Sequence, residues 1–434
     1  MPYQKGSRLG GERASKLGHL DVIQSELVNK IIEEFESPAD LENSTSLNWV
    51  EFDAKQETQL NIVFSVDGSI QEIRSDQQPW RELAFVKVAL LSLRQNEIDK
   101  LDRKSPHPLA LRDIMKDSAI QHSTVLPLKN ISLPGMNNCN AVRKIVFDSL
   151  KDASIDGIAM DTLKWLFYEK WTGDTGKSSP EFQCPHCEEV IAGLPYDAEI
   201  HSCSNCSEEV FISDVIGFHL EMADDSTPGT VASSYMLIYE TLLLFTGIRF
   251  FWEQDKLDVL QKCLFIKDGP LTLRSQYSKL AIPIRRLFAY AKSIGVTIHM
   301  VGQEKTGSFV DHLELISRNA PSQSYFLPDN DYIRSEIQQR PTRSEDYGLR
   351  TNYGNKVFVK TDDYHSMVLS IPTGEYTDSD TIERLHGAVN IISALKGLIS
   401  YKHENALVPI ELANGVASLS SYPSAAILKL FSGV

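Results

Sequence analysis

Two short apolar stretches of the sequence each lead into an aspartate followed by a glycine. Ile62–Val66 precedes Asp67, and Cys263–Ile266 precedes Lys267 and Asp268. We interpret both stretches as buried β-strands, and a carboxylate at the carboxyl end of such a strand lies at a sheet edge, where ligands and metals usually bind. Two such carboxylates on neighbouring strands can share divalent cations, which are the usual device for hydrolysing phosphodiesters.

The alternative for each Asp-Gly pair is a simple turn, because this dipeptide is common in turns. The matching apolar stretches before Asp67 and Asp268 favour the functional interpretation. A third acid is needed to hold one or two ions well, and Glu240 is our candidate because it interrupts the apolar helical stretch 236–244. A charge in such a stretch is rarely buried without a partner. The alternatives are a solvent-facing Glu240 and Glu253 as the third acid.

Four of the six cysteines form two C-x-x-C pairs, and fifteen residues separate the pairs: Cys184, Cys187, Cys203 and Cys206. This spacing predicts four thiolates arranged tetrahedrally around Zn²⁺. A site closed by four protein ligands is structural, and it would hold residues 181–212 together because so short a segment has little core of its own. Two unrelated redox pairs are the alternative, but neither pair has a thioredoxin-like sequence around it.

The composition excludes several classes of protein. The net charge of −15 argues against coating nucleic acid by bulk electrostatics, although it permits an enzyme that meets DNA at one local site. No apolar run reaches the length of a membrane span, and the segment 1–11 lacks the apolar core of a secretion signal. We therefore expect a cytoplasmic protein with no membrane partner.

Apolar periodicity predicts the elements that must position these residues. We expect an amphipathic helix over 15–37, a strand over 61–66 with a hairpin partner at 69–74, and surface connections over 95–140. The strand–helix–strand order from 263 to 301 predicts a parallel βαβ unit and hence an α/β fold. We predict further helices at 148–168, 235–245, 254–260, 282–294 and 381–401, and further strands at 83–91, 216–222, 356–360 and 367–371.

Three short motifs resemble, in order, the successive motifs of the NurA nucleases: Ser65–Ser69, Lys267–Leu271 and Val301–Lys305. The acidic helix lies between the two aspartate strands, as in that family, and Val408–Asn414 resembles the family's closing motif. The resemblance implies an RNase H-like mixed sheet flanked by helices, with the zinc ribbon as an insertion.

This resemblance also implies a domain organisation and an activity. We expect an N-terminal helical segment over 1–58 and a nuclease domain over 59–434 that contains the ribbon at 181–212. The family uses Mn²⁺ or Mg²⁺ and degrades DNA ends beside a HerA-type hexameric ATPase. By this resemblance the chain would be a homodimer that acts in DNA end resection and repair or in antiviral defence.

Carried across residue by residue, the resemblance makes Asp67, Glu240 and Asp268 the metal carboxylates, holding two ions. Lys305 would contact the scissile phosphate or a nearby one, and a solvated loop lysine is the alternative. We expect Arg274, Arg285 and Arg286 to guide the DNA backbone without reading its sequence.

Two positions depart from the family pattern. Asn414 stands where the family commonly has a histidine, and Ala406 stands where it has a tyrosine. An asparagine can offer its carbonyl oxygen to a hard cation, so Asn414 is our fourth metal ligand, but it cannot act as a base. The departures favour a second hypothesis, a catalytically weak or inactive scaffold that docks on the ATPase and binds DNA. An RNA-directed enzyme on the same core is a third.

Overall fold

The computed structural model describes residues 22–34, 47–52, 59–100, 119–223, 227–338, 346–376, 381–400, 406–419 and 423–434. The chain divides into two compact units, Met1–Leu47 and Asn48–Val434. The first contains helix α2 (Glu26–Glu34), which agrees with the centre of the helix predicted over 15–37. Residues 15–21 and 35–37 of that prediction lie outside the described residues.

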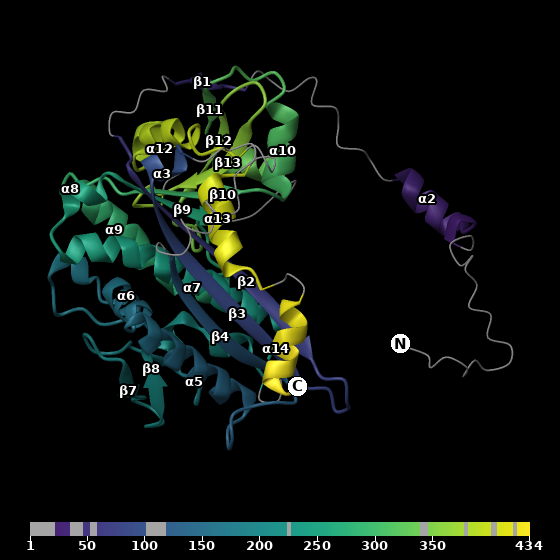
Figure 1. The fold of residues 1–434 in the computed structure, drawn as a ribbon, viewed down its shortest axis with the longest axis vertical. Coiled ribbons are helices and arrows are strands. Elements are labelled where there is room, and N and C mark those ends of the chain that lie inside the picture. Colours follow the sequence, from purple (N-terminus) through teal and green to yellow (C-terminus); the bar gives the residue numbers. More distant parts are fainter. Residues whose placement is uncertain are drawn as a thin grey trace. The chain divides into compact units, whose positions relative to one another are not determined.

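The described part of the second unit is built on a mixed sheet of nine strands (Figure 1). In spatial order these are β1 (Val50–Glu51), β11 (Ser324–Phe326), β12 (Asn355–Lys360), β13 (Ser366–Ile371), β10 (His299–Glu304), β9 (Cys263–Asp268), β2 (Ile62–Arg74), β3 (Glu82–Arg94) and β4 (Ala119–Lys129). β2, β3 and β4 pair antiparallel, whereas β9 lies parallel to both β2 and β10. The predicted parallel unit from 263 to 301 is confirmed, as are the predicted strands at 356–360 and 367–371, which pair antiparallel as β12 and β13.

Each face of the sheet has its own helices and its own hydrophobic core. One face packs against α5 (Asn138–Leu150), α6 (Ile158–Phe167), α7 (Gly229–Glu253) and α9 (Ala281–Ser293). The other carries α12 (Ala388–Leu395), α13 (Val408–Ala417) and α14 (Ser424–Ser432), and α13 and α14 cross β2 and β3 in Figure 1. Successive strand residues point to opposite faces, so Phe64 and Val66 join the first core and Val63 joins the second.

Helix α7 is the one helix among the described residues that is long and apolar enough to cross a membrane. Within the protein, 83% of its apolar window is buried. It packs against both β2 and β3 beneath the sheet, which is the position of a core helix.

The predicted hairpin of 61–66 with 69–74 is wrong, because β2 continues as one strand through Asp67 and Gly68. β2 pairs with β3 over its whole length, from Ile62 opposite Arg94 to Arg74 opposite Glu82. The chain turns only after Arg74. Asp67 therefore lies inside a long strand, whereas Asp268 is the last residue of its shorter neighbour.

Three other predicted segments, one connecting region, one helix and one strand, differ from the structure. Residues 95–140, expected as surface connections, contain β4, with Pro127 beside a shift in its register with β3. The helix predicted over 148–168 is split into α5 and α6 by a 3₁₀ turn at Ala153–Ile155. The predicted strand at 216–222 is a 3₁₀ turn over Phe218–Glu221, since Gly217 adopts a φ of 99°.

Two predicted helical regions have different bounds. The two helices predicted over 235–260 are the single long α7 and the short α8 (Leu257–Leu260). The helix predicted over 381–401 is limited to α12 within the described residues. α10 (Ser308–Ile316), α3 (Gln95–Ile98) and α11 (Asn330–Tyr332) complete the α-helices described.

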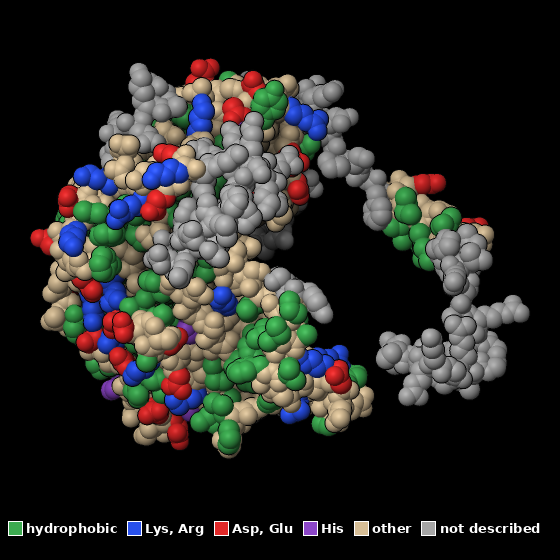
Figure 2. Space-filling model, viewed as in Figure 1, with side chains coloured by type: hydrophobic (Ala, Val, Ile, Leu, Met, Phe, Trp, Pro, Cys, Tyr) green, Lys and Arg blue, Asp and Glu red, His purple; other side chains and the backbone are tan. Residues whose placement is uncertain are grey.

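The cysteine segment forms two small hairpins, β5 (Phe182–Gln183) with β6 (Val190–Ile191) and β7 (Ile200–Ser202) with β8 (Glu209–Phe211). Each hairpin turns through one C-x-x-C pair. Acidic and basic side chains are interspersed on the surface in Figure 2, while hydrophobic side chains gather over α14, where Ile427, Leu430 and Phe431 are exposed.

Candidate active site and metal centres

Asp67 and Asp268 are neighbours on the α13 face of the sheet. β2 and β9 pair in parallel with Val66 opposite Lys267, so the next residue of each strand is one of the two aspartates. Asp67 is buried, and the Asp268 side chain is 28% exposed. Burial and the nearby charge of Asp268 raise the pKa of Asp67, against the opposing effects of Asn414, the Gly68 N–H and Lys305.

The Asp67 carboxylate has an oxygen that lacks a hydrogen-bond partner. Oδ1 accepts the N–H of Gly68 at 2.8 Å, whereas Oδ2 is buried without a partner among the described residues. An unsatisfied buried carboxylate oxygen is costly, and a hard divalent cation satisfies such an oxygen well. The donor set at Asp67 and Asp268 therefore fits a divalent ion.

Helix α13 brings Asn414 to Asp67. Pro409 in its first turn favours the helix start. Two contacts fix its other end across the sheet: Lys87 Nζ donates to the Val416 carbonyl at 2.6 Å, and the Leu419 N–H donates to Ser69 Oγ at 3.1 Å. The Asn414 side chain lies close enough to Asp67 to oppose the rise in the pKa of that carboxyl.

Lys305 follows directly after β10 and lies beside the same pair of acids. Its Nζ is 3.0 Å from Asp268 Oδ2, and both side chains are about one-third exposed, at 32% and 28%. Lys305 is therefore not a solvated loop lysine without a partner. Its ammonium lies on the partly exposed side of the Asp268 carboxylate.

Glu240 approaches the acids from the opposite face. A Cβ built on Gly68 would lie 2.7 Å from Glu240 Oε1 and 2.5 Å from Met236 Cγ, so α7 packs directly on the Gly68 backbone. Because Asp67 and Gly68 are consecutive in a strand, their side-chain positions face opposite sides. The glycine thus allows close helix packing and is not there for a turn.

Lys267 accompanies Glu240 on this second face. Its Nζ donates to Glu240 Oε2 at 3.1 Å and to the Asp268 carbonyl at 3.1 Å. Burial raises the pKa of Glu240 to about 7, against the charge of Lys267 and with further contributions from Asp67 and Asp268. Burial opposes charging of Lys267, but the Glu240 carboxylate together with Tyr353 and Asp268 raises the pKa of the lysine.

The structure thus brings Asp67, Asp268, Asn414 and Lys305 together on one face, with Glu240 behind the sheet. Glu253, the second candidate for the third acid, lies thirteen residues further along α7 and pairs with Arg249 at 3.5 Å. At about 1.5 Å rise per residue it is about 20 Å from Glu240 along the helix.

The three arginines expected to contact DNA all have partners within the protein. Arg274 donates to Ser233 and Ser234 at 3.0 Å each. Arg285 donates to backbone carbonyls of 348–352, and Arg286 pairs with Glu169 at 2.6 Å. Arg274 and Arg286 are exposed and Arg285 is partly buried, so their role toward DNA stays a prediction.

The sequence analysis did not single out Glu411 as a ligand. It lies in α13 one turn before Asn414, on the same face of the helix, and its Oε1 is buried without a partner among the described residues. Its spacing of three residues from Asn414 was the available signal, because two ligands at i and i+3 on one helix face can bind the same metal site, as in the Glu-x-x-His motif of di-iron helix bundles.

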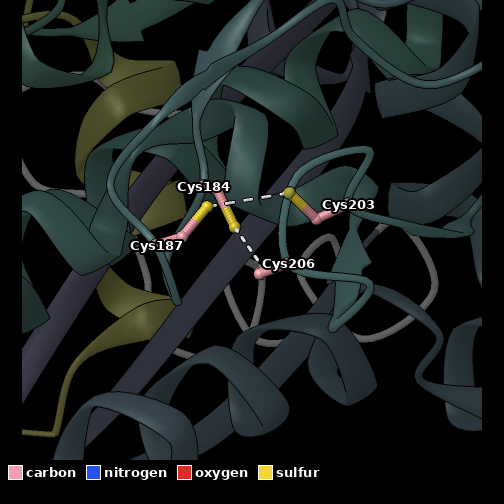
Figure 3. A group of neighbouring side chains, drawn as sticks. All are labelled: Cys184, Cys187, Cys203 and Cys206. Atoms are coloured by element: carbon pink, nitrogen blue, oxygen red, sulfur yellow. Dashed lines mark hydrogen bonds between the residues drawn. The ribbon is translucent and has the colours of Figure 1, made fainter.

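The four cysteines form one cluster, and all their Sγ atoms lie within 4.8 Å of one another (Figure 3). The Sγ atoms of Cys184 and Cys206 are 3.8 Å apart, as are those of Cys187 and Cys203. Tetrahedral zinc with Zn–S bonds of about 2.3 Å places its sulfur atoms about 3.8 Å apart. The residues fit a closed four-thiolate metal site with no open position.

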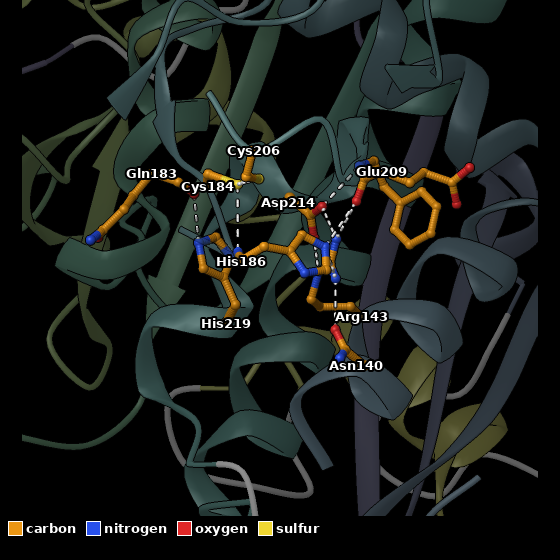
Figure 4. Close-up of polar contacts among 10 residues, drawn as sticks. Asn140, Arg143, Gln183, Cys184, His186, Cys206, Glu209, Asp214 and His219 are labelled. Atoms are coloured by element: carbon orange, nitrogen blue, oxygen red, sulfur yellow. Dashed lines mark hydrogen bonds and ion pairs between the residues drawn. The ribbon is translucent and has the colours of Figure 1, made fainter. Parts of the chain in front are cut away.

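A buried ion pair fastens this cysteine unit to α5 (Figure 4). Arg143 donates to both carboxylate oxygens of Asp214, at 2.8 and 2.7 Å, and both side chains are almost completely buried. The same guanidinium reaches the Glu209 carbonyl at 3.2 Å and His186 Nε2 at 3.1 Å. His186 is thus a docking residue in this structure, and its ring points to α5.

The sequence matches no protein-family model and no curated protein. Among solved structures, the chain is similar to the crystal structure of the NurA nuclease from Sulfolobus solfataricus. The TM-score is 0.37 and the identity is 9%, over 96% of this chain and 97% of that chain. A similarity this low establishes neither a shared fold nor a shared activity, and the function of this chain must be inferred from its own site.

Proposed function

We propose that this protein is a divalent-metal-dependent deoxyribonuclease. The observation that carries the proposal is the adjacency of Asp67 and Asp268 on parallel strands, together with the unsatisfied buried oxygen of Asp67. Such a carboxylate pair is suited to a hard cation at a phosphodiester. The order β4-β3-β2-β9-β10, three antiparallel strands and then two parallel ones, supports the RNase H-like class.

Asp67, Asp268 and Asn414 would hold Mn²⁺ or Mg²⁺. Glu240, expected from the sequence as a third metal carboxylate, pairs with Lys267 behind the sheet and is not a ligand in this proposal. The ion supplies Lewis acidity and lowers the pKa of an attacking water. Lys305 would leave Asp268 to neutralise the phosphate. In the reaction, the water oxygen would bond to phosphorus and lose a proton to solvent, while the bond to the leaving sugar oxygen breaks and that oxygen takes up a proton from solvent.

The cysteine cluster would hold Zn²⁺ in a purely structural role, because four thiolates leave no position for substrate. Arg274, Arg285 and Arg286 would guide the DNA backbone. A HerA-type hexameric ATPase would deliver duplex ends to a cytoplasmic homodimer, in DNA repair or antiviral defence. Delivery by a motor would also explain how a chain of net charge −15 handles DNA.

The test is cleavage of linear duplex DNA in Mn²⁺ by Asp67→Asn and Asp268→Asn, each with and without the motor partner. We expect both variants to lose activity by at least about a hundredfold, because each removes a charge at the developing transition state. Asp258→Asn, at an exposed position in α8, is the matched control. Parental cleavage by both site variants would rule out the proposal.

The second candidate is a non-catalytic scaffold on the same ATPase, and Asn414 favours it because an amide cannot act as a base. A scaffold should bind zinc tightly but show no Mn²⁺ site that Asp268→Asn abolishes. Calorimetric titration of the zinc-loaded chain with MnCl₂ separates the two candidates without an activity assay.

A further inference from the structure

We propose that Lys267 is an internal cation of the candidate active site, whose ammonium stands where a second divalent ion would otherwise bind to Glu240. The chain would then hold a single divalent ion, on the face of the sheet that carries Asp67 and Asp268. This inference rests on the proposed metal-dependent activity and gives the site its ion count.

The burial and contacts of Lys267 leave its ammonium no route to solvent. The side chain is 2% exposed, and its partner Glu240 is 6% exposed. An ammonium has three donors and no acceptor, so it must be surrounded by acceptors when buried. Glu240 Oε2 and the Asp268 carbonyl, each at 3.1 Å, supply two of them. A divalent ion on Glu240 Oε2 would have to displace this ammonium.

The two faces of the sheet differ in what their carboxylates lack. On the α7 face, Glu240 already has a cation within hydrogen-bond distance. On the α13 face, Asp67 Oδ2 has no partner among the described residues, and the partner described for the Asp268 carboxylate is Lys305, whose side chain is about one-third exposed. The carboxylates that an added cation would stabilise therefore lie on the α13 face.

The charges give the same count. Behind the sheet, Lys267 matches the Glu240 carboxylate. On the α13 face, the carboxylates of Asp67, Asp268 and the candidate ligand Glu411 face the single ammonium of Lys305. One divalent ion offsets the two negative charges that remain, and a second would leave excess positive charge in a largely buried site, where unpaired charge is costly.

The experiment counts Mn²⁺ on the full-length, zinc-loaded chain by isothermal titration calorimetry and by electron paramagnetic resonance of free Mn²⁺. We expect one Mn²⁺ per chain, lost in Asp67→Asn and unaffected in Asp258→Asn. The double variant Lys267→Met with Glu240→Gln removes the buried pair while keeping similar volumes, so it should fold and keep one Mn²⁺. The Mn²⁺ dissociation constant of the double variant should stay within about threefold of the wild-type value. Loss of a residue that supports a metal site typically weakens metal affinity about tenfold or more.

Lys267→Met alone gives a second measurement. It leaves the Glu240 carboxylate without its ammonium, and we expect an additional Mn²⁺ per chain, removed again by Glu240→Gln. Two ions on the wild-type chain, or a loss of affinity of about tenfold or more in the double variant, would overturn the inference. DNA cleavage is assayed separately: a chain that binds one Mn²⁺ but never cuts DNA refutes the nuclease proposal alone, and one that cuts DNA with two ions refutes this inference alone.

Discussion

At the scale of single residues, the candidate site depends on which side of a strand each side chain takes. Asp67 and Gly68 are adjacent in sequence, yet one faces α13 and the other faces α7. The aspartate supplies the unsatisfied carboxylate. The glycine lets α7 approach closely enough for Glu240 to lie against the strand.

Gly68→Ala tests this packing. The added methyl group would lie 2.5 Å from Met236 Cγ and 2.7 Å from Glu240 Oε1, so the helix must shift. We expect the free energy of unfolding in urea to fall by about 2 kcal/mol, as for other overpacked cores. Gly176→Ala, in an exposed loop, should change it by less than about 0.5 kcal/mol. Equal values for the two variants would contradict the close packing.

Glu411→Gln tests whether the unassigned carboxylate of α13 serves the same ion as Asn414. The substitution keeps the shape of the side chain but removes its charge, and we expect Mn²⁺ affinity to fall about tenfold or more. Calorimetry measures it, with Glu314→Gln at an exposed position of α10 as control. An unchanged dissociation constant would remove Glu411 from the site.

His386 predicts part of the acid sensitivity of the fold. Burial, with Lys292 and His299 nearby, lowers the pKa of His386 to about 4 from its ordinary value of 6.5. The ring is neutral when folded, so its contribution is complete above pH 6.5 and is lost as the pH falls toward 4. The loss is on the order of 3 kcal/mol, at about 1.4 kcal/mol per pKa unit.

In His386→Gln we expect the free energy of unfolding to depend less on pH between 6.5 and 4 than in wild type. Denaturant titrations at half-unit pH steps measure this difference. His299, whose pKa burial also lowers to about 4, keeps part of the slope in the variant. Identical slopes for the two proteins would show that the His386 ring is not kept neutral by the fold.

The sequence was sufficient to identify Asp67, Asp268 and Glu240 as candidates, but it could not show on which face of the sheet each side chain lies. Asp67 and Asp268 could be paired because matching apolar stretches precede them. That Glu240 lies behind the sheet depends on the register of β2 with β9 and on helix packing at Gly68, which are tertiary properties. Lys267 was not identified because a lysine beside a candidate metal ligand has no distinctive spacing.

At the scale of elements, the cysteine unit is part of the helical layer. Its strands have two or three residues each, too few to be stable alone, and Arg143 joins it to α5 through a buried pair with Asp214. Metal binding and docking should therefore stabilise the same layer that supports α7.

Arg143→Met tests the docking of this unit. The variant leaves Asp214 buried and unpaired, and removing one partner of a buried pair typically costs about 3–5 kcal/mol. We expect a loss of that size in urea unfolding, and the double variant Arg143→Met with Asp214→Leu should recover part of it. Lys144→Met, whose pair with Asp148 is exposed, is the control and should cost less than about 1 kcal/mol. Equal losses for Arg143→Met and Lys144→Met would mean that the buried pair does not hold the unit.

Elements with regular apolar periodicity could be predicted, and those set by tertiary pairing could not. β9, α9 and the β12–β13 hairpin agree with their patterns. The prediction ended β2 too early because Asp-Gly resembles a turn. It missed β4 because Pro127 and its polar neighbours suggest a loop. In both strands, pairing with β3 decides the structure over local preference.

At the scale of the whole molecule, every residue of both candidate metal sites lies in the unit Asn48–Val434. We expect a chain that begins at Asn48 to keep the zinc content, the Mn²⁺ count and the thermal unfolding midpoint of the full chain within about 2 °C, because small changes in stability shift the midpoint only by a few degrees. Metal analysis and scanning calorimetry check this. Loss of either metal on truncation would show that the first 47 residues complete a site.

The sheet at Asp67 is one peptide thick, and ionic groups lie directly above and below it. Their influence on each other passes through that layer as an electric field and needs no shared contact. Changing a charge under the sheet should consequently retune ion affinity above it without moving any ligand. With this arrangement, substitutions at residues that do not contact substrate can change the affinity of the protein for its metal ion.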